Sequence, residues 1–334
     1  MKFLVIGCGS IGKRHIGNLV RLGVEDIWAF DLSRERVDEV REQFCIRTVK
    51  SLEEAWERNP DAAIIAVPTS LHLPLATEAA EHGCHLFVEK PLSHSTDGVN
   101  PLLRLVQRRG LVTLVGCNMR FHPGIRYVKS LVDEEAVGHI VAARVEVGQY
   151  LPDWHPGEDY RQMYSARRDL GGGIILDAIH EIDYIRWMLG EVGAVACFTG
   201  KLSRLEIDTE DTAAILLRFE SGAIGELHLD YIQRTYSRSC HIIGEEGTIR
   251  WDFMEGMVRW YSAKARKWEK FINLEGWEPN QMYLDEMAHF LRCLEGREKP
   301  MLDVIEAKRV LDIALAAKVA AEEERIVRIN QNAR

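Results

Sequence analysis

The sequence predicts an α/β fold, in which a doubly wound parallel sheet is followed by an α+β domain with an open, mainly antiparallel sheet. In the first third of the chain, short apolar runs alternate with segments of helical spacing, which is the pattern of βαβ units. After about residue 120, apolar residues recur at every second position between tight turns, as in antiparallel strands. We therefore expect two domains in these 334 residues, 1–120 and 121–334.

The first domain should contain five buried strands with helices between them. The strands are expected at the apolar runs 3–6, 27–30, 62–67, 85–88 and 112–115. The helices are expected over 11–22, 33–44, 73–82 and 95–109.

The second domain should contain hairpins and three helices. Alternation over 141–147 and 212–232 predicts strands, and glycine-containing turns are expected at 220–223 and 244–247. Helical spacing is found over 174–189, 280–295 and 303–324. An exposed sheet face in such a domain would favour a homo-oligomer.

Composition argues against several classes of protein. Acidic residues outnumber basic ones, 51 to 42, and the net charge of −9 disfavours binding to nucleic acid. The seven cysteines are dispersed without a C-x-x-C pair, which predicts free thiols, no metal site and a cytoplasmic protein. The N-terminal apolar run is too short for a signal peptide, and no run approaches the length of a membrane span.

A glycine-rich turn follows the first expected strand. The segment Gly7-Cys8-Gly9-Ser10-Ile11-Gly12 fits G-x-G-x-x-G between a strand and a helix. Gly7 permits the tight turn, Gly9 lets the backbone approach a pyrophosphate, and Gly12 lets the helix pack closely. Ser10 and Ile11 open the helix whose N-terminus offers free N–H groups to phosphates. The motif predicts a Rossmann-type dinucleotide-binding domain.

Asp31 stands at the end of the second expected strand, nineteen residues after Gly12. A carboxylate at that position can accept hydrogen bonds from both ribose hydroxyls of adenosine and would repel a 2′-phosphate. NAD is therefore favoured, while the nearby Arg34 keeps NADP possible.

Three further segments, together with the glycine turn, make the chain resemble the Gfo/Idh/MocA family of oxidoreductases. They are 67–72 (VPTSLH), 88–91 (VEKP) and 171–177 (GGGIILD), the last running on to His180 and Asp183. Many members have one more residue between the aspartate and the histidine. The shorter D-x-x-H-E form found here resembles members linked to surface-polysaccharide and nonulosonate sugar pathways.

The resemblance implies roles for several residues. Lys90 resembles the active-site lysine of the family, His180 its catalytic histidine and Asp177 the neighbouring acid. Contacts to the cofactor are implied for a group of residues at strand ends: Pro68, Thr69, His72, Glu89 and Lys90. Asn118, which follows the last strand of the first domain, is expected to contact the cofactor because of its position.

The residue types themselves suit hydride transfer. Oxidation of an alcohol needs a base for the hydroxyl proton, and histidine titrates near the working pH. A lysine ammonium can stabilise developing alkoxide charge. If one helix covers this segment, Asp177, His180 and Glu181 share a face. Each residue also has a plainer interpretation, as a surface lysine or an ordinary helix pair. A metal site would need a third ligand that the sequence does not place.

Substrate contacts are expected in two places. Arg120 and His122 follow the last strand of the first domain, and Trp154, Arg161 and Tyr164 lie in a polar, aromatic loop before the glycine run. Such groups often hold sugars, but they are equally typical of ordinary loops and cores.

The sequence thus predicts an NAD(P)-dependent oxidoreductase. It would move a hydride between nicotinamide and a hydroxyl or keto carbon of a sugar, sugar nucleotide or polyol. Two alternatives are a reductase of a non-sugar cyclic substrate and a non-catalytic, NAD-sensing regulator.

Overall fold

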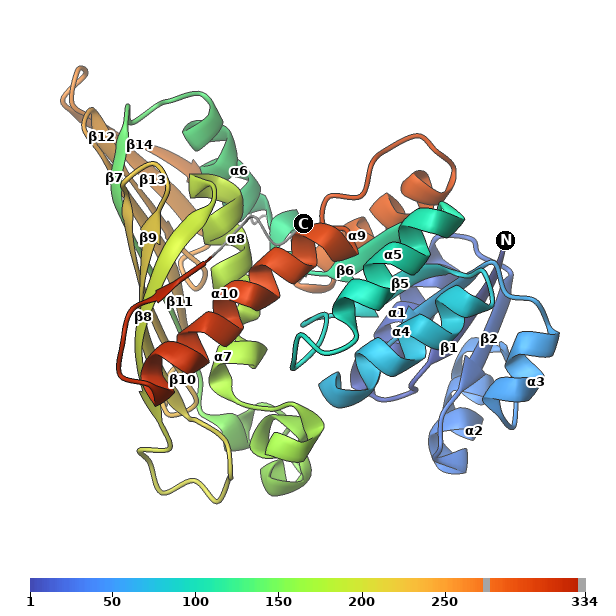
Figure 1. The fold of residues 1–334 in the computed structure, drawn as a ribbon. Helices are drawn as coiled ribbons and strands as arrows, with labels where there is room; N and C mark the ends of the chain where they lie inside the picture. The colour runs from blue at the N-terminus through green and yellow to red at the C-terminus, as the bar shows by residue number, and fades with distance from the viewer. Residues whose placement is uncertain (273–276, 330–334) are drawn as a thin grey trace. The chain divides into compact units, whose positions relative to one another are not determined.

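The computed structural model describes residues 1–272 and 277–329. The chain forms two compact units, shown in Figure 1. The first comprises Met1–Asn118 and Pro279–Lys308, and the second comprises Met119–Glu278 and Arg309–Arg334.

The first unit is built on a six-stranded parallel sheet with the strand order β3-β2-β1-β4-β5-β6. Its strands are β1 Lys2–Ile6, β2 Asp26–Phe30, β3 Arg47–Thr48, β4 Ala62–Ile65, β5 His85–Glu89 and β6 Thr113–Gly116. The order reverses between β1 and β4, the point at which doubly wound sheets bind dinucleotides. The predicted parallel sheet is confirmed.

The strands of this sheet are apolar and its helices are amphipathic. All four residues of β4 are buried, as expected for a parallel strand covered on both faces. The helices are α1 Ser10–Arg21, α2 Arg34–Phe44, α3 Leu52–Glu57, α4 His72–Glu81, α5 Val99–Arg109 and α9 Asn280–Leu294. The short β3 and α3 were not predicted, although Ser51 caps α3 by accepting a hydrogen bond from the Glu54 amide.

Helix α9 returns the chain to the first unit. Met287 and Phe290 are fully buried in its core, and Phe290 packs edge-on against Phe87 of β5 with 5.7 Å between ring centroids. The side-chain amide of Asn280 donates to Asn18 Oδ1 of α1 at 2.9 Å. The predicted division into 1–120 and 121–334 leaves this return out, because periodicity shows that a helix has an apolar face but not what the face packs against.

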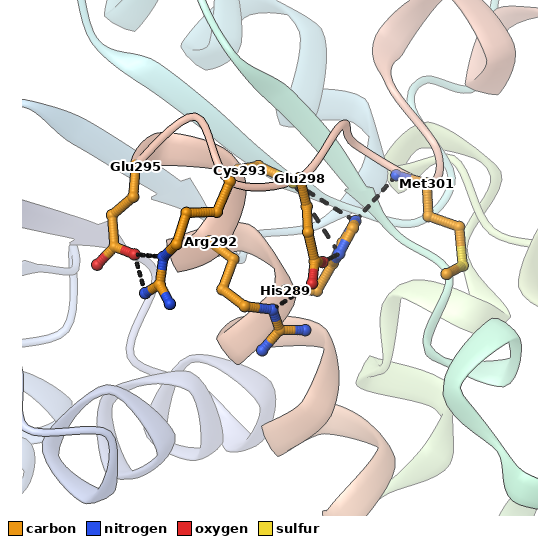
Figure 2. A network of polar contacts seen from close by, with 7 residues as sticks. His289, Arg292, Cys293, Glu295, Glu298 and Met301 are labelled. Atoms are coloured by element: carbon orange, nitrogen blue, oxygen red, sulfur yellow. Dashed lines mark hydrogen bonds and ion pairs between the residues drawn. The ribbon is translucent and has the colours of Figure 1, made fainter.

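A polar network closes the turn after α9, as Figure 2 shows. His289 Nε2 accepts from the Met301 amide at 3.0 Å, so Nδ1 carries the hydrogen and donates to Glu298 Oε2 at 2.5 Å. Arg292 donates to the other oxygen of Glu298 at 2.6 Å. The buried His289 therefore fixes the turn at two points, the backbone amide of Met301 and the side chain of Glu298.

The second unit contains a nine-stranded sheet with the order β14-β13-β12-β11-β7-β10-β9-β8-β15. Its strands are β7 Ile140–Gly148, β8 Val192–Gly200, β9 Thr212–Phe219, β10 Ile224–Asp230, β11 Ser237–Gly244, β12 Gly247–Asp252, β13 Met257–Ser262, β14 Lys267–Ile272 and β15 Val327–Arg328. Only β7 and β10 pair in parallel among these neighbours. The predicted open, mainly antiparallel sheet is confirmed.

Helices α6, α7 and α8 pack on one face of this sheet (Figure 1). They span Pro123–Asp133, Ile174–Asp177 and Ile179–Leu189. The other face exposes apolar side chains: Phe198 is 85 % exposed, and Leu216 and Ile224 are about half exposed. The last helix, α10 (Val304–Glu322), begins in the first unit and continues into the second. None of the described helices combines the length and apolar character needed to cross a membrane.

Candidate active site

The predicted cofactor residues of the first unit share one edge of the sheet. The strands β1, β2, β4, β5 and β6 run in one direction, so their carboxyl ends meet at that edge. Gly7 follows β1, Asp31 follows β2, the 67–72 segment follows β4, Lys90 follows β5 and Asn118 follows β6. Residues far apart in the chain are thereby collected where a dinucleotide would lie.

The three glycines of the turn meet different surroundings. Gly7 has φ +98°, and a Cβ there would lie 2.2 Å from the Ala66 carbonyl oxygen. A Cβ on Gly12 would lie 1.9 Å from the Gly7 carbonyl oxygen. Gly9, by contrast, has no atom within 4 Å of the position of a Cβ. Packing thus requires glycine at 7 and 12, whereas Gly9 faces open space in front of the N-terminus of α1.

The Asp31 carboxylate is already held by the turn. Its two oxygens accept from the amides of Cys8 at 2.7 Å and Ser33 at 2.8 Å. A carboxylate oxygen can accept more than one hydrogen bond, so both keep capacity for ribose hydroxyls. Burial, and then the charge of Asp31, raise the pKa of the Cys8 thiol to about 12, so that this cysteine is inert at neutral pH.

The segment around Lys90 is anchored by Glu89. Glu89 Oε1 lies 2.6 Å from His15 Nε2 of α1, and Oε2 accepts from the Lys90 amide at 3.2 Å. Burial raises the pKa of Glu89, but the hydrogen bond and charge of His15 outweigh it and hold the pKa below the usual value. The predicted cofactor contact of Glu89 stays a prediction, and its carboxylate already has protein partners.

His72 ties the segment after β4 to the segment after β5. Its Nδ1 lies 2.7 Å from the Pro91 carbonyl oxygen, and its Nε2 lies 2.8 Å from the Val67 carbonyl oxygen. Burial lowers the pKa of His72 and outweighs these two carbonyls. Thr69 is also buried, whereas Pro68 is half-buried. His72 thus joins two loops of the first unit by hydrogen bonds, and its direct contact with the cofactor stays a prediction.

The second unit contains the other predicted catalytic residues. Asp177 ends α7 and His180 lies in the first turn of α8, and both are buried. The prediction of one uninterrupted helix over 174–189 is wrong at Ala178, whose ψ of 27° breaks it into α7 and α8. A shared face for Asp177, His180 and Glu181 therefore cannot be argued from helical spacing.

Each acid in this segment has its own partner. Tyr231, at the end of β10, donates to Asp177 Oδ2 at 2.5 Å and is fully buried. Burial, followed by the charge of Asp177, raises the pKa of Tyr231 well above its usual value, so its hydroxyl stays a donor. Glu181 instead pairs with Arg238 at 2.7 Å in the interior of the unit.

Two predicted substrate residues belong to the interior of the second unit. Arg120 is 3 % exposed and forms two hydrogen bonds with Asp183, at 2.9 and 2.7 Å. His122 caps α6 by accepting from the Gly124 amide and packs edge-on against Trp251. Burial, and then the charge of Arg238, lower the pKa of His122 to about 4. These contacts give both residues a structural role that their place after the last strand did not reveal.

The other three predicted substrate residues lie in the loop before the glycine run. Trp154 is half-buried, and its ring meets the Tyr231 ring edge-on with 5.4 Å between centroids. Tyr164 is half-buried as well. Arg161 is exposed and pairs with Asp159 and Glu206 at 2.8 and 3.0 Å. Trp154 is thereby linked to Asp177 through Tyr231.

Lys90 belongs to the first unit and His180 to the second, so their convergence on one substrate stays a prediction. Across residues 1–272 and 277–329, no three histidine, cysteine, aspartate or glutamate side chains are grouped to hold a metal ion.

Sequence reasoning missed His15 and Tyr231. His15 lies three residues after the glycine motif on the inner face of α1, and Tyr231 follows a strand directly. A polar residue at an otherwise apolar helix position was the available signal for His15. Nothing local distinguishes Tyr231 from an ordinary core tyrosine.

The glycine turn yields a paired prediction. Gly12→Ala should lower the free energy of unfolding by about 3 kcal/mol, because its Cβ would overlap the Gly7 carbonyl. Gly9→Ala should leave that free energy unchanged and weaken NAD binding about tenfold or more, because its methyl group would stand in the open space. Urea unfolding and calorimetric titration with NAD measure the two effects. Unchanged NAD affinity in Gly9→Ala would contradict this placement of the cofactor.

Comparison with known proteins identifies the family. Residues 1–117 match the model described as an oxidoreductase family with an NAD-binding Rossmann fold, and residues 125–250 match the GFO/IDH/MocA C-terminal domain. The chain is 28 % identical to myo-inositol 2-dehydrogenase of Thermotoga maritima, over 99 % of both chains.

Two solved structures resemble the whole chain. The WlbA dehydrogenase from Bordetella pertussis, in complex with NADH and UDP-GlcNAcA, is 25 % identical with a TM-score of 0.83, and 99 % of each chain is covered. A levoglucosan dehydrogenase in complex with NADH shares the fold, with a TM-score of 0.89 at 21 % identity and 99 % of each chain covered. The chain therefore belongs to the Gfo/Idh/MocA family of oxidoreductases, and its N-terminal part is an NAD-binding Rossmann domain.

Proposed function

We propose that this protein is an NAD-dependent dehydrogenase that moves a hydride between nicotinamide and a hydroxyl carbon of a polyol, sugar or sugar nucleotide. The observation that carries the proposal is the shared sheet edge, which brings the glycine turn, Asp31 and Lys90 to one side of the first unit. The names of relatives that match the chain along its length, an inositol dehydrogenase and a dehydrogenase in complex with UDP-GlcNAcA, support this substrate class.

NAD is the preferred cofactor in this proposal. The Asp31 carboxylate is fixed by two backbone amides and would repel a 2′-phosphate at close range. NADP remains a second cofactor to be compared in the assay, because Arg34 is near in sequence. When bound, NAD supplies the acceptor for the hydride that leaves the alcohol carbon.

Lys90 and His180 divide the remaining chemistry. As the alcohol is oxidised, its hydroxyl loses a proton, and His180 is proposed to accept it. The Lys90 ammonium stabilises the negative charge that develops on the same oxygen. In the reverse direction, His180 returns the proton to that oxygen. Asp177, fixed by Tyr231, is the neighbouring acid that orients the substrate or the imidazole.

The substrate contacts are proposed in the loop before the glycine run. Trp154 and Tyr164 are half-buried, and Trp154 touches the tyrosine that fixes Asp177. Arg161, though held by two carboxylates, remains exposed and can meet an anionic group of a sugar nucleotide. Arg120 and His122 are held in the interior by Asp183 and by the Gly124 amide, and their contact with substrate stays a prediction.

The seven cysteines are free, and six of them are buried. We propose on this ground that the protein works in a reducing compartment, the cytoplasm.

A substrate panel tests the proposal. Purified protein should reduce NAD with at least one of myo-inositol, scyllo-inositol, UDP-N-acetylglucosamine and levoglucosan. Lys90→Ala should bind NAD within about threefold of the wild type and lose about 100-fold or more in kcat, because the positioned charge is gone. Absorbance at the reduced nicotinamide band measures turnover, and calorimetry measures binding.

The matched control is Lys50→Ala, which removes an exposed lysine next to the cap of α3. It should behave as the wild type in both measurements. Wild-type activity retained in Lys90→Ala would remove the proposed role of Lys90. An NAD-binding protein that turns over no member of the panel would favour the sensing regulator.

We further propose that the open face of the second sheet packs against a second copy of this chain. Phe198, Leu216 and Ile224 expose apolar area there, and an exposed ion pair between Arg144 and Glu226 lies on the same face. A face with apolar residues and both signs of charge can complement itself across a two-fold axis.

Disruption of that face tests the oligomer. Phe198→Asp should shift the protein from dimer or higher oligomer toward monomer in light scattering after size exclusion, because it would bury a carboxylate between copies. Val20→Asp, at an exposed apolar residue of α1 in the first unit, is the control and should leave the mass unchanged. A wild-type protein that is monomeric at micromolar concentration would contradict the proposal.

A further inference from the structure

His15 is a buried polar residue for which the proposed chemistry has no direct use. It lies on α1 with 0 % exposure, and its ring packs edge-on against Phe87 with 4.9 Å between centroids. Its Nε2 lies 2.6 Å from Glu89 Oε1. An ionised carboxylate can only accept, so Nε2 carries the hydrogen of this bond. In the described residues Nδ1 has no hydrogen-bond partner, so Glu89 accounts for the polar contact of the ring.

The surroundings of the Glu89 carboxylate are also specific to it. Its Oε2 accepts from the Lys90 amide at 3.2 Å, on the residue that carries the proposed catalytic ammonium. A Cβ on Gly116 of the neighbouring strand β6 would lie only 3.1 Å from Oε1, so glycine there leaves room for the carboxylate. Since an unpaired buried carboxylate is costly, the pocket that holds Glu89 depends on the donor that His15 supplies.

We propose that His15 is a positioning residue for Lys90, acting through Glu89 to fix the end of β5 against helix α1. This inference rests on the proposed function of Lys90. The same helix carries the glycine turn at its N-terminus, so one rigid element would set both the cofactor phosphates and the backbone from which Lys90 projects.

A histidine with a purely structural role could lie anywhere in the fold and would not affect Lys90. His289 provides such a case for comparison with His15. The buried His289 and the exposed Glu298 form another histidine–glutamate pair in the first unit, at 2.5 Å, and it closes the turn after α9 (Figure 2). Removal of either histidine should destabilise the unit. Only removal of His15 should lower kcat.

The charge of Glu89 provides a pH-dependent readout. Burial raises the pKa of Glu89. The hydrogen bond and charge of His15 lower it, as do the charges of Lys90 and His72, so that the pKa lies below its usual value. Tyr283 of α9 also interacts with Glu89, and Arg14 and Glu286 lie near that tyrosine in turn. Without His15, the pKa of Glu89 should rise, and Glu89 should become protonated at a higher pH than in the wild type. The acid limb of the kcat–pH profile should then move to higher pH.

The experiment compares His15→Leu, His15→Gln, His289→Leu and the wild type, with the panel substrate of highest turnover. His15→Leu should lower kcat about tenfold, change the KM for NAD less than about threefold, and move the acid limb upward by about one pH unit. His15→Gln places an amide N–H near the former Nε2 and should restore most of kcat. His289→Leu should lose thermal stability while keeping the wild-type kcat and pH profile.

A second measurement does not need turnover. Hydrogen exchange followed by mass spectrometry should show faster exchange in peptides over residues 85–92 for His15→Leu and unchanged exchange there for His289→Leu. This readout separates the two proposals, because an inactive wild type would overturn the dehydrogenase while exchange still reports on the anchor.

Two results would overturn the positioning role. One is a His15→Leu protein that loses stability but keeps the wild-type kcat, pH profile and exchange over 85–92. The other applies if His15→Leu does not fold: His15→Asn, whose amide is too short to replace Nε2, is then combined with Glu89→Gln, and the double variant would show the product of the two single losses in kcat. Residues that act through each other should give a double variant no worse than the poorer single one.

Discussion

In the first unit, Gly12 of α1 packs directly against Gly7, which follows β1, and the remaining geometry of the cofactor edge depends on this contact. Neither position has room for a Cβ, so the helix lies directly on the strand end. This contact leaves the amides at the start of α1 facing the edge of the sheet. It also brings the next turn of the helix close enough for the short side chain of His15 to reach Glu89 on β5. One backbone contact thus determines the positions of both the phosphate cradle and the lysine segment.

In the second unit, buried ion pairs fix the helix that carries His180, and a tyrosine fixes Asp177. Glu181 and Asp183 are completely buried on α8, and each meets an arginine from another element. Such pairs add little net stability, because desolvation offsets their attraction, but loss of one partner is costly. They therefore fix the rotation of α8. Asp177 lies before the break at Ala178 and needs its own anchor, which Tyr231 provides from β10.

Sequence patterns predicted the parallel sheet well because burial on both faces leaves continuous apolar runs, such as Ala62–Ile65, between glycine and proline residues. The motif at Gly7–Gly12 was informative because Gly7 and Gly12 stand where the backbone leaves no room for a Cβ. Long-range side-chain partners left no comparable trace. Arg120 and His122 look like ligand contacts in sequence because they follow a strand, yet Asp183 and Trp251, which determine their role, lie more than sixty residues away. The break at Ala178 was also hidden, since alanine favours helix and nothing in the local sequence marks an interruption there.

Two histidine–glutamate pairs of the first unit, each with a buried histidine, show why chemistry alone does not identify a functional residue. His15 and His289 have the same partner type at nearly the same distance, and both are almost fully buried. They differ in what the glutamate touches next. Glu298 also meets Arg292 at the surface, whereas Glu89 meets the backbone of Lys90 at the end of a central strand. A displacement of Glu298 would be absorbed by a surface turn. A displacement of Glu89 would be passed to the ammonium, since only one peptide bond separates the two residues. Position relative to the strand ends, and not the pair itself, is what connects a buried histidine to catalysis.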